Sequence, residues 1–211
     1  MIKSIIREII RPLYMIVFRL NWRRHNKHND TNAINKFHWK HVSVGRATYG
    51  PIEVLYDSGA GKLSIGSYCS IATNVKFFLG GGHNYRNITT YPFQTKVYLG
   101  YKNIHRNKKN DIVVGDDVWI GYDSIILAGS RIGKGCVIGA RSVVTGDIPP
   151  YSVYVVNKVI KQRFPKEIIE RIKNIDFSTI GHSKGDTYQQ YYNTEINDKN
   201  VDIIMQAFIK G

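Results

Sequence analysis

The chain has 211 residues, of which 43% are hydrophobic and 22% are charged. This composition suits a single globular domain and excludes collagen-like, fibrous and wholly disordered proteins. Thirty Lys and Arg residues against 16 Asp and Glu residues give a formal net charge of +14. Such a charge favours an acidic partner, whether nucleic acid, an anionic membrane surface or a phosphate-bearing small molecule, and does not choose among them.

Residues 1–41 form the first region, a basic helical extension. They contain nine basic and two acidic residues, so half of the net charge lies here. Apolar residues recur at helical spacing over residues 2–22, which predicts an amphipathic helix that Pro12 breaks or kinks. Two interpretations remain open: residues 1–24 lie on a membrane surface, or the helix packs on its own domain or a neighbouring subunit. The arginines available for membrane contact are Arg7, Arg11, Arg19, Arg23 and Arg24.

Two further features favour a cytoplasmic protein. Cys69 and Cys136 are the only cysteines, too few for a secreted disulfide framework. The longest apolar run near the N-terminus, from Leu13 to Phe18, is shorter than a signal-peptide core and much shorter than a bilayer span. We therefore expect neither a signal peptide nor a transmembrane helix.

A six-residue repeat runs through the middle of the chain. Its in-phase positions hold Ile65, Ile71 and Phe77, and then Val114, Ile120, Ile126, Ile132, Ile138 and Val144. A mostly small residue, including both cysteines, stands four places after each of them, and Gly follows several directly. A parallel β-helix with short strands and tight corners has this period, whereas a helix or an alternating strand does not. We predict a β-helix over residues 42–157, with inward-facing cysteines and with glycines at backbone angles that other residues rarely adopt.

The two blocks of hexads are out of phase, since the 49 positions from Ile65 to Val114 are not a multiple of six. A loop over residues 80–111 must therefore interrupt the coil, and long loops inside compact domains are usually functional. The loop opens with three glycines before His83 and contains a basic stretch free of acidic residues, with Lys96, Lys102, Arg106, Lys108 and Lys109. The repeat ends at Pro149-Pro150, where consecutive prolines cannot continue a ladder.

Residues 158–211 form the last region. A helix is predicted after Pro165, with Ile168, Ile169, Ile172 and Ile175 on one face. The following stretch is polar, and the apolar residues between Val201 and Phe208 predict a short docking helix.

An ordered set of motifs carries a family resemblance. The hexads are joined by Gly-Gly-His-Asn at 81–84, Thr-Thr-Tyr-Pro-Phe at 89–93, Asp-Val-Trp-Ile-Gly at 117–121 and a closing Lys-Val-Ile-Lys-Gln-Arg-Phe at 158–164. Together they resemble the hexapeptide-repeat acyltransferases, in the branch of xenobiotic and polysaccharide O-acetyltransferases. The resemblance implies a left-handed parallel β-helix and a homotrimer with active sites between subunits.

The chemistry implied by the resemblance is transfer of an acetyl group from acetyl-CoA to a hydroxyl. A hydroxyl attacks a thioester poorly unless its proton is removed as the bond forms, and a neutral imidazole suits that task. His83 matches the position of the family's general base; a purely structural loop histidine is the alternative. The oxyanion needs N–H donors that the sequence does not assign.

Other site residues follow from the same resemblance. Asn84 and Tyr91 match positions at the acceptor, although a tyrosine anchoring the loop would look the same. The residues matched to the acyl donor are Trp119, Ala128, Gly129, Lys158, Lys161 and Arg163. In relatives the small pair accommodates the pantetheine arm, and the basic residues would meet CoA phosphates. Trp119 could instead be an aromatic residue that shields a coil edge. The basic residues could instead form a solvated surface.

The chain departs from the family pattern before its last strand. Many relatives carry Gly-Asn-Pro-Ala-Lys there, whereas this chain has Val155-Val156-Asn157-Lys158 and is about two residues shorter. This change resembles enzymes of cell-surface polysaccharides more than drug-modifying ones, so we predict a sugar hydroxyl as acceptor. An N-acetyltransferase of a nucleotide-linked amino sugar, an antibiotic O-acetyltransferase and a non-catalytic β-helical scaffold or binding protein remain alternatives.

Metal and nucleic-acid binding are not expected. His25, His28, His38 and His41 have suggestive spacings, but histidines in a basic terminal segment are usually solvated. No nucleic-acid recognition motif accompanies the positive charge.

Overall fold

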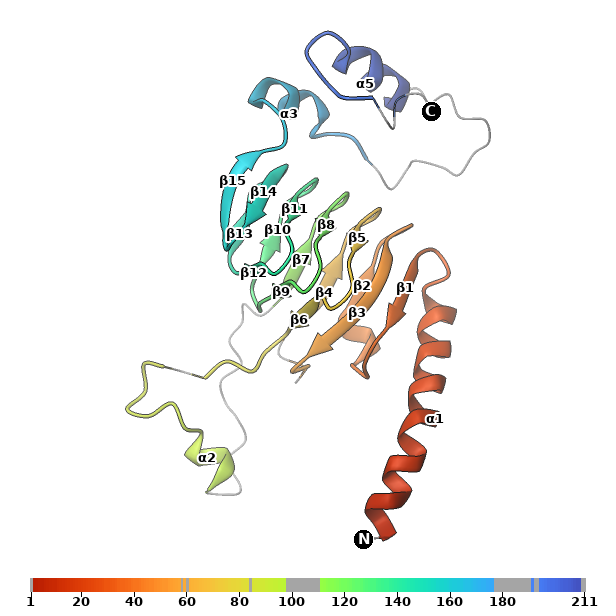
Figure 1. Cartoon of the computed structure of the whole chain (residues 1–211), viewed down its shortest axis with the longest axis vertical. Coiled ribbons are helices and arrows are strands. Elements are labelled where there is room, and N and C mark those ends of the chain that lie inside the picture. Colours follow the sequence, from red (N-terminus) through yellow and green to blue (C-terminus); the bar gives the residue numbers. More distant parts are fainter. Residues whose placement is uncertain are drawn as a thin grey trace.

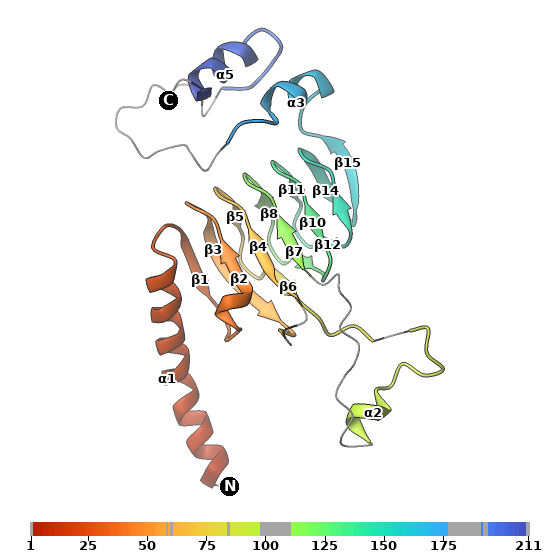
Figure 2. The ribbon, with the colours of Figure 1, turned by 180° about the vertical axis from the view of Figure 1, so that it is seen from behind.

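A computed structural model describes residues 2–57, 59, 61–83, 85–97, 111–176, 191 and 194–209. Short parallel strands stack into a β-helix with three faces (Figures 1 and 2). The first face contains β2 (Val42–Val44), β4 (Leu63–Ile65), β7 (Ile112–Val114), β10 (Arg131–Ile132) and β13 (Asp147–Ile148). The second contains the start of β3 (Tyr49–Leu55), then β5 (Ser70–Ile71), β8 (Trp119–Ile120), β11 (Val137–Ile138) and β14 (Ser152–Val155). The third contains the end of β3, β6 (Lys76–Phe78), β9 (Ile125–Ile126) and β12 (Val143–Val144).

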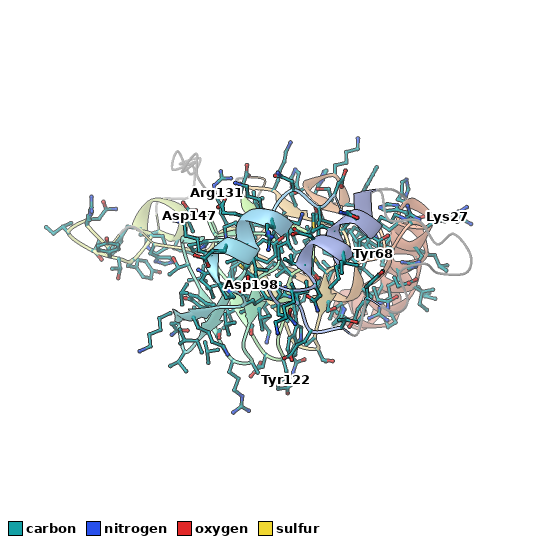
Figure 3. The ribbon with its side chains drawn as sticks, turned by 90° about the horizontal axis from the view of Figure 1, so that it is seen from above. Lys27, Tyr68, Tyr122, Arg131, Asp147 and Asp198 are labelled. Atoms are coloured by element: carbon teal, nitrogen blue, oxygen red, sulfur yellow. The ribbon has the colours of Figure 1, made fainter. Side chains whose placement is uncertain are left out.

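The faces meet at three edges, which Figure 3 shows from above. Arg131 and Asp147, which are paired in register, mark the edge where the third face turns into the first. Tyr68 marks the edge between the first and second faces, and Tyr122 the edge between the second and third. The parallel β-helix expected from the hexads is therefore confirmed.

The in-phase residues form the core. Ile65, Val114, Ile132 and Ile148 align across the first face, and each is at most 3% exposed. Phe77, Ile126 and Val144 align across the third face and are fully buried. The pairing of Ile65 with Val114 shows that the two blocks of hexads stack in register although the loop separates them along the chain.

The glycines after the aliphatic positions have a different role from the one expected. Gly121 and Gly133 do not have positive φ angles, but a Cβ on Gly121 would lie 2.6 Å from the Ala140 nitrogen and one on Gly133 2.5 Å from the Pro150 nitrogen. They allow neighbouring coils to approach closely. The left-handed angles occur two residues later instead, at non-glycine residues such as Asp117 and Asp123.

The N-terminal helix α1 (Ile2–His25) continues through Pro12, so the break considered at that residue is wrong. Its C-terminal end packs on the body: Trp22 is 3% exposed, and the rings of Phe18 and Trp22 both meet Phe37 edge-on at 5.2 Å. Strand β1 (Asp30–Ala33) then pairs with β3, so sheet pairing begins before residue 42. Within the described part of the chain, no helix is long and apolar enough to cross a membrane.

Strand β15 (Lys158–Gln162) and helices α3 (Lys166–Ile172) and α5 (Val201–Ile209) follow the last coil, and the two helices lie above the strands in the view of Figure 1. Strand β15 returns antiparallel along β14 after a tight turn in which Val156 and Asn157 both have positive φ angles. Helices α3 and α5 form where the apolar spacing predicted helices. They pack together and bury Ile168, Ile172 and Val201 with Tyr151.

Both cysteines point into the core, and we predict that neither reacts in the native protein. Burial raises the pKa of the Cys69 thiol to about 12 and that of Cys136 to about 11, so the reactive thiolate is suppressed at pH 8. An aromatic disulfide reagent should titrate no thiol in the folded chain and two after denaturation. Rapid labelling of the native protein would contradict this assignment.

Candidate active site

The inserted loop leaves the β-helix at the edge where the third face turns into the first. Among the described residues, 56–57, 61–62, 79–83, 127–130 and 145–146 lie at successive corners of this edge. The described part of the loop, with the short helix α2 (Phe93–Lys96), projects away from the coils (Figures 1 and 2). We refer to this edge as the loop edge.

His83 lies on the projecting loop with an exposed side chain, and its ring is oriented by one hydrogen bond. The Nδ1 atom is 2.6 Å from the carbonyl oxygen of Thr90. A carbonyl oxygen only accepts, so Nδ1 must carry the proton and donate it. In the neutral ring Nε2 then has a free lone pair, which is the state that a general base requires.

The predicted acceptor residues are close to this histidine in the sequence. Tyr91 follows Thr90, is 51% exposed and packs its ring against Phe93 of the same loop, with centroids 4.8 Å apart. Its N–H donates to the Thr89 hydroxyl at 3.2 Å. Asn84 lies outside the described residues, as do Lys102, Arg106, Lys108 and Lys109 of the basic stretch.

A cavity of about 440 Å³ opens at the first corner of the loop edge. It is lined by Asn35, Lys36, Phe37, His38, Val54, Leu55, Tyr56 and Asp57. The Tyr56 ring covers the base of the loop, because a Cβ on Gly81 would lie 2.8 Å from its Cγ atom. The same ring packs on Phe78 with centroids 5.5 Å apart. The cavity and the loop carrying His83 therefore share a wall.

The Asp57 carboxylate organises the wall of this cavity. It accepts hydrogen bonds from His41 Nδ1 at 2.8 Å and from the His38 N–H at 2.7 Å. Burial alone would raise the pKa of Asp57, but these bonds outweigh burial and hold it below its usual value. Our expectation that these histidines are solvated is wrong for His41, which is half-buried, whereas His28 is exposed and also bonds the Val44 carbonyl through Nε2.

Sequence analysis did not select Tyr56, Asp57 or His41 as site residues. Sixteen positions separate His41 from Asp57, and neither belongs to a hexad. The sequence did contain one indication: Tyr56 and Asp57 stand at the corner one coil before the inserted loop, so they could have been expected near it. Within the described residues, no group of three or more His, Cys, Asp or Glu side chains could hold a metal ion.

Trp119 and Lys161 occupy one row on the outside of the second face. The register runs from Trp119 to Val137, then to Val153 and then to Lys161. With strands about 4.8 Å apart, the two ends of this row are separated by about 14 Å. Trp119 is 56% exposed, and every side chain of β15 is exposed. The row is therefore an accessible strip with an indole at one end and an ammonium group at the other.

The remaining predicted donor residues fall in different places. Lys158 begins β15 beside the tight turn. Ala128 and Gly129, the latter with a φ of 84°, form a corner of the loop edge. The Arg163 guanidinium is bound internally, since Nη1 donates to the Asp117 carboxylate at 3.1 Å and to the Gly135 carbonyl at 2.7 Å. Only its other N–H groups could reach a phosphate.

The structure thus divides the predicted residues into two sets. His83, Tyr91, Ala128 and Gly129 belong to the loop edge, whereas Trp119, Lys158 and Lys161 belong to the second face and its hairpin. Residues 111–146, which include Trp119, Ala128 and Gly129, match the family model described as bacterial transferase hexapeptide (six repeats).

The chain is 39% identical over 145 residues to a probable macrolide acetyltransferase of Lysinibacillus sphaericus, covering 65% of this chain and 80% of that protein. The chain belongs to the hexapeptide-repeat acetyltransferases. It is also 39% identical over 126 residues to a chloramphenicol acetyltransferase of Agrobacterium fabrum, covering 55% of this chain but only 59% of that relative. Among solved structures, a maltose O-acetyltransferase of Clostridium difficile 630 matches with 30% identity and a TM-score of 0.46, covering 64% of this chain and 67% of that one.

The close approach of Tyr56 to Gly81 lets us predict how Gly81→Ala changes the activity of this hexapeptide-repeat acetyltransferase. Gly81 has a φ of 87°, so Gly81→Ala introduces both backbone strain and a clash with the Tyr56 ring. The loop base must shift, and a shift of about 1 Å at a catalytic group costs on the order of 10²-fold in rate. We expect kcat to fall about 10- to 100-fold while the melting temperature changes little.

Gly82→Ala is the matched control, because its added Cβ would meet nothing within 4 Å and Gly82 does not have a positive φ. It should retain near-normal kcat. Equal activity of the two variants would show that the base of the loop does not position the site.

Proposed function

We propose that the protein is an acetyl-CoA-dependent O-acetyltransferase that modifies a sugar hydroxyl of a cell-surface polysaccharide or its precursor, with His83 as general base. The observation that carries this proposal is the 2.6 Å contact between His83 Nδ1 and the Thr90 carbonyl, which leaves Nε2 able to accept a proton. The family membership supplies the acetyl-transfer chemistry.

The proposed reaction balances with this one residue. Nε2 of His83 takes the acceptor's hydroxyl proton as its oxygen bonds to the thioester carbonyl carbon. The tetrahedral intermediate then loses the carbon–sulfur bond, and the imidazolium returns its proton to the departing CoA thiolate. The products are an acetyl ester and CoA, and the histidine is regenerated. Backbone N–H groups of the neighbouring coil are the proposed donors to the oxyanion.

We assign the acyl donor to the exposed strip from Trp119 to Lys161, with Lys158 beside it. Ammonium groups attract phosphates, and the indole offers an apolar surface to the acyl arm. Arg163 is a weaker candidate because Asp117 already neutralises its charge. Ala128 and Gly129 remain the proposed path of the pantetheine arm, since small residues permit close approach to the backbone. A solved hexapeptide-repeat acetyltransferase from Vibrio cholerae is complexed with acetyl coenzyme A.

We further propose a homotrimer in which one chain supplies the loop edge and its neighbour supplies the second face. The division of the predicted residues between these two surfaces supports this arrangement. Light scattering should give a mass near three times 24.1 kDa. A fully active monomer would refute the shared site.

The cavity lined by Tyr56 and Asp57 is the proposed acceptor pocket. It combines an aromatic ring with a carboxylate, a lysine and an exposed histidine, which are groups that pack against a sugar ring and bond its hydroxyls. An antibiotic hydroxyl is the second candidate acceptor, favoured by the 39% identity to macrolide and chloramphenicol acetyltransferases.

An acceptor screen with acetyl-CoA tests the function. Free CoA would be measured with oligosaccharides, an amino sugar nucleotide, a macrolide and chloramphenicol, each compared with His83→Ala. Release that depends on a sugar hydroxyl supports the proposal, and release with the amino sugar alone points to N-acetylation. Antibiotic-dependent release favours the second candidate, and no release with any acceptor rejects catalysis.

Trp119→Ala tests the donor strip. Removing an exposed indole from a ligand contact should raise the Kd for acetyl-CoA about tenfold, while kcat at saturation changes less. Tyr122→Ala is the matched control, because Tyr122 is 47% exposed on the same coil but at the edge between the second and third faces (Figure 3). Calorimetric titration with CoA measures both. If the two variants bound CoA with equal affinity, Trp119 would not contact the acyl donor.

A further inference from the structure

The N-terminal helix α1 has two apolar sides, and its own domain covers one of them. Phe18 and Trp22 lie on the covered side, packed against Phe37. The covered side is reinforced by polar bonds, since the Trp22 indole donates to Thr31 Oγ1 at 3.1 Å and Arg19 Nε donates to the Ala33 carbonyl at 3.0 Å. These contacts explain why the C-terminal end of α1 is anchored to the β-helix.

The second side is exposed. Its residues are Leu13, Ile16, Val17 and Leu20, which are 60%, 53%, 56% and 58% exposed. At about 100° per residue, these four positions fall within an arc of about 100°, on the opposite side of the helix from Phe18 and Trp22. We call this surface the outer stripe. In the sequence, isoleucines recur at the same helical spacing before residue 12.

The placement of α1 leaves the outer stripe accessible. The helix begins beyond the β-helix and meets the body only toward its C-terminal end, beside β1 (Figures 1 and 2). Single exposed apolar residues are ordinary on protein surfaces, but a contiguous apolar stripe along a helix marks an interaction site. Its four members are spaced i, i+3, i+4 and i+7, so they form one continuous surface.

The positive charge around α1 indicates which kind of partner fits the outer stripe. Residues 1–41 carry nine basic and two acidic residues, and the last turn of α1 contains Arg23 and Arg24. Arg23 is held by its own domain, since Nη1 donates to the carbonyl oxygens of Asn29 and Thr31. Arg24 and Lys27 are exposed at the end of the stripe. A second copy of this helix would bring like charges together, whereas phosphate headgroups would be attracted to them. Amphipathic helices with a basic border and an apolar side bind in the plane of anionic bilayers.

We infer that α1 is an interfacial membrane anchor, with Leu13, Ile16, Val17 and Leu20 inserted among the acyl chains of an anionic bilayer and the neighbouring basic residues at its headgroups. The covered side keeps the β-helix attached through Phe18 and Trp22. This arrangement would hold the enzyme at a membrane surface without a spanning helix. It is independent of which acceptor the enzyme uses.

Vesicle co-sedimentation of the full chain tests this inference. The variant Val17→Gln/Leu20→Gln removes apolar area from the outer stripe and keeps good helix propensity. We expect it to bind vesicles of 70% phosphatidylcholine and 30% phosphatidylglycerol at least tenfold more weakly than the wild type. Wild-type binding should also weaken in 0.5 M salt and on pure phosphatidylcholine, because part of it is electrostatic.

Two comparisons make the outcome decisive. Ile203→Gln is the matched control, since Ile203 is an equally exposed apolar residue on α5 at the other end of the molecule (58%) and should bind vesicles like the wild type. Light scattering of Val17→Gln/Leu20→Gln tests whether another copy of the chain covers the stripe. If the variant bound vesicles like the wild type but had a lower mass, the outer stripe would be a contact between subunits and not with a membrane. If neither vesicle binding nor mass changed, the outer stripe would not be an interaction site.

Discussion

Replacing His83 with alanine should lower the rate of acetyl transfer by about 10²- to 10⁴-fold, the range for loss of a positioned general base. The Kd for acetyl-CoA should barely change, because the strip from Trp119 to Lys161 that we propose for the acyl donor lies on the second face and not on the loop. Single-turnover rates and CoA calorimetry separate the two effects.

A second histidine provides a matched control for that result. His25 Nδ1 also bonds a main-chain carbonyl, that of Asn21 at 2.8 Å, but at the end of α1 and not on the loop. His25→Ala should retain wild-type kcat. A near-normal kcat in His83→Ala would remove the proposed base and leave only the family membership in place.

Truncating the core at Phe77 should have the largest effect on stability. This side chain is fully buried and is the largest among the most deeply buried residues, and it stacks on Ile126 in the next coil. Phe→Ala in a packed core costs about 3–5 kcal/mol, from lost apolar burial and the cavity left behind. Equilibrium urea unfolding should therefore give Phe77→Ala a free energy of unfolding that is lower by this amount, seen as a lower urea midpoint.

Phe78→Ala tests the same residue type one position later. Because strand residues alternate, Phe78 lies outside the core, half-exposed against Tyr56. Its loss should cost less than about 1.5 kcal/mol. If the two variants were equally destabilised, the hexad phase would not determine which side chains enter the core.

The hexads were sufficient to predict the β-helix because each in-phase aliphatic residue must enter the core once per face. They were not sufficient to explain the glycines. Whether Gly133 is needed for its φ angle or for its lack of a Cβ depends on the distance to the next coil, and here that distance leaves no room for a side chain. The spacing also predicted helices α3 and α5, which bury Ile168, Ile172 and Val201 in one cluster, although Ile203 of α5 is exposed.

In the candidate site, too, the sequence predicted some features and only the structure showed the others. His83 could be selected from its motif, but its orienting partner could not, because the Thr90 carbonyl is a main-chain group with no sequence signature. Arg163 matched a basic closing motif, yet folding brings it beside Asp117, 46 positions earlier in the chain. Motifs report which side chains are present and do not report which of them already have partners.

The sequence by itself determined the β-helix, its interruption by a long loop and an amphipathic N-terminal helix, because these depend on periodicities between neighbouring residues. Only the tertiary structure decided which side of α1 is covered, how the Asp57 carboxylate holds His41, and that the predicted residues divide between the loop edge and the second face. These features depend on contacts between residues far apart in the chain. Their energies come from burial and hydrogen bonding in three dimensions, which a linear pattern does not record.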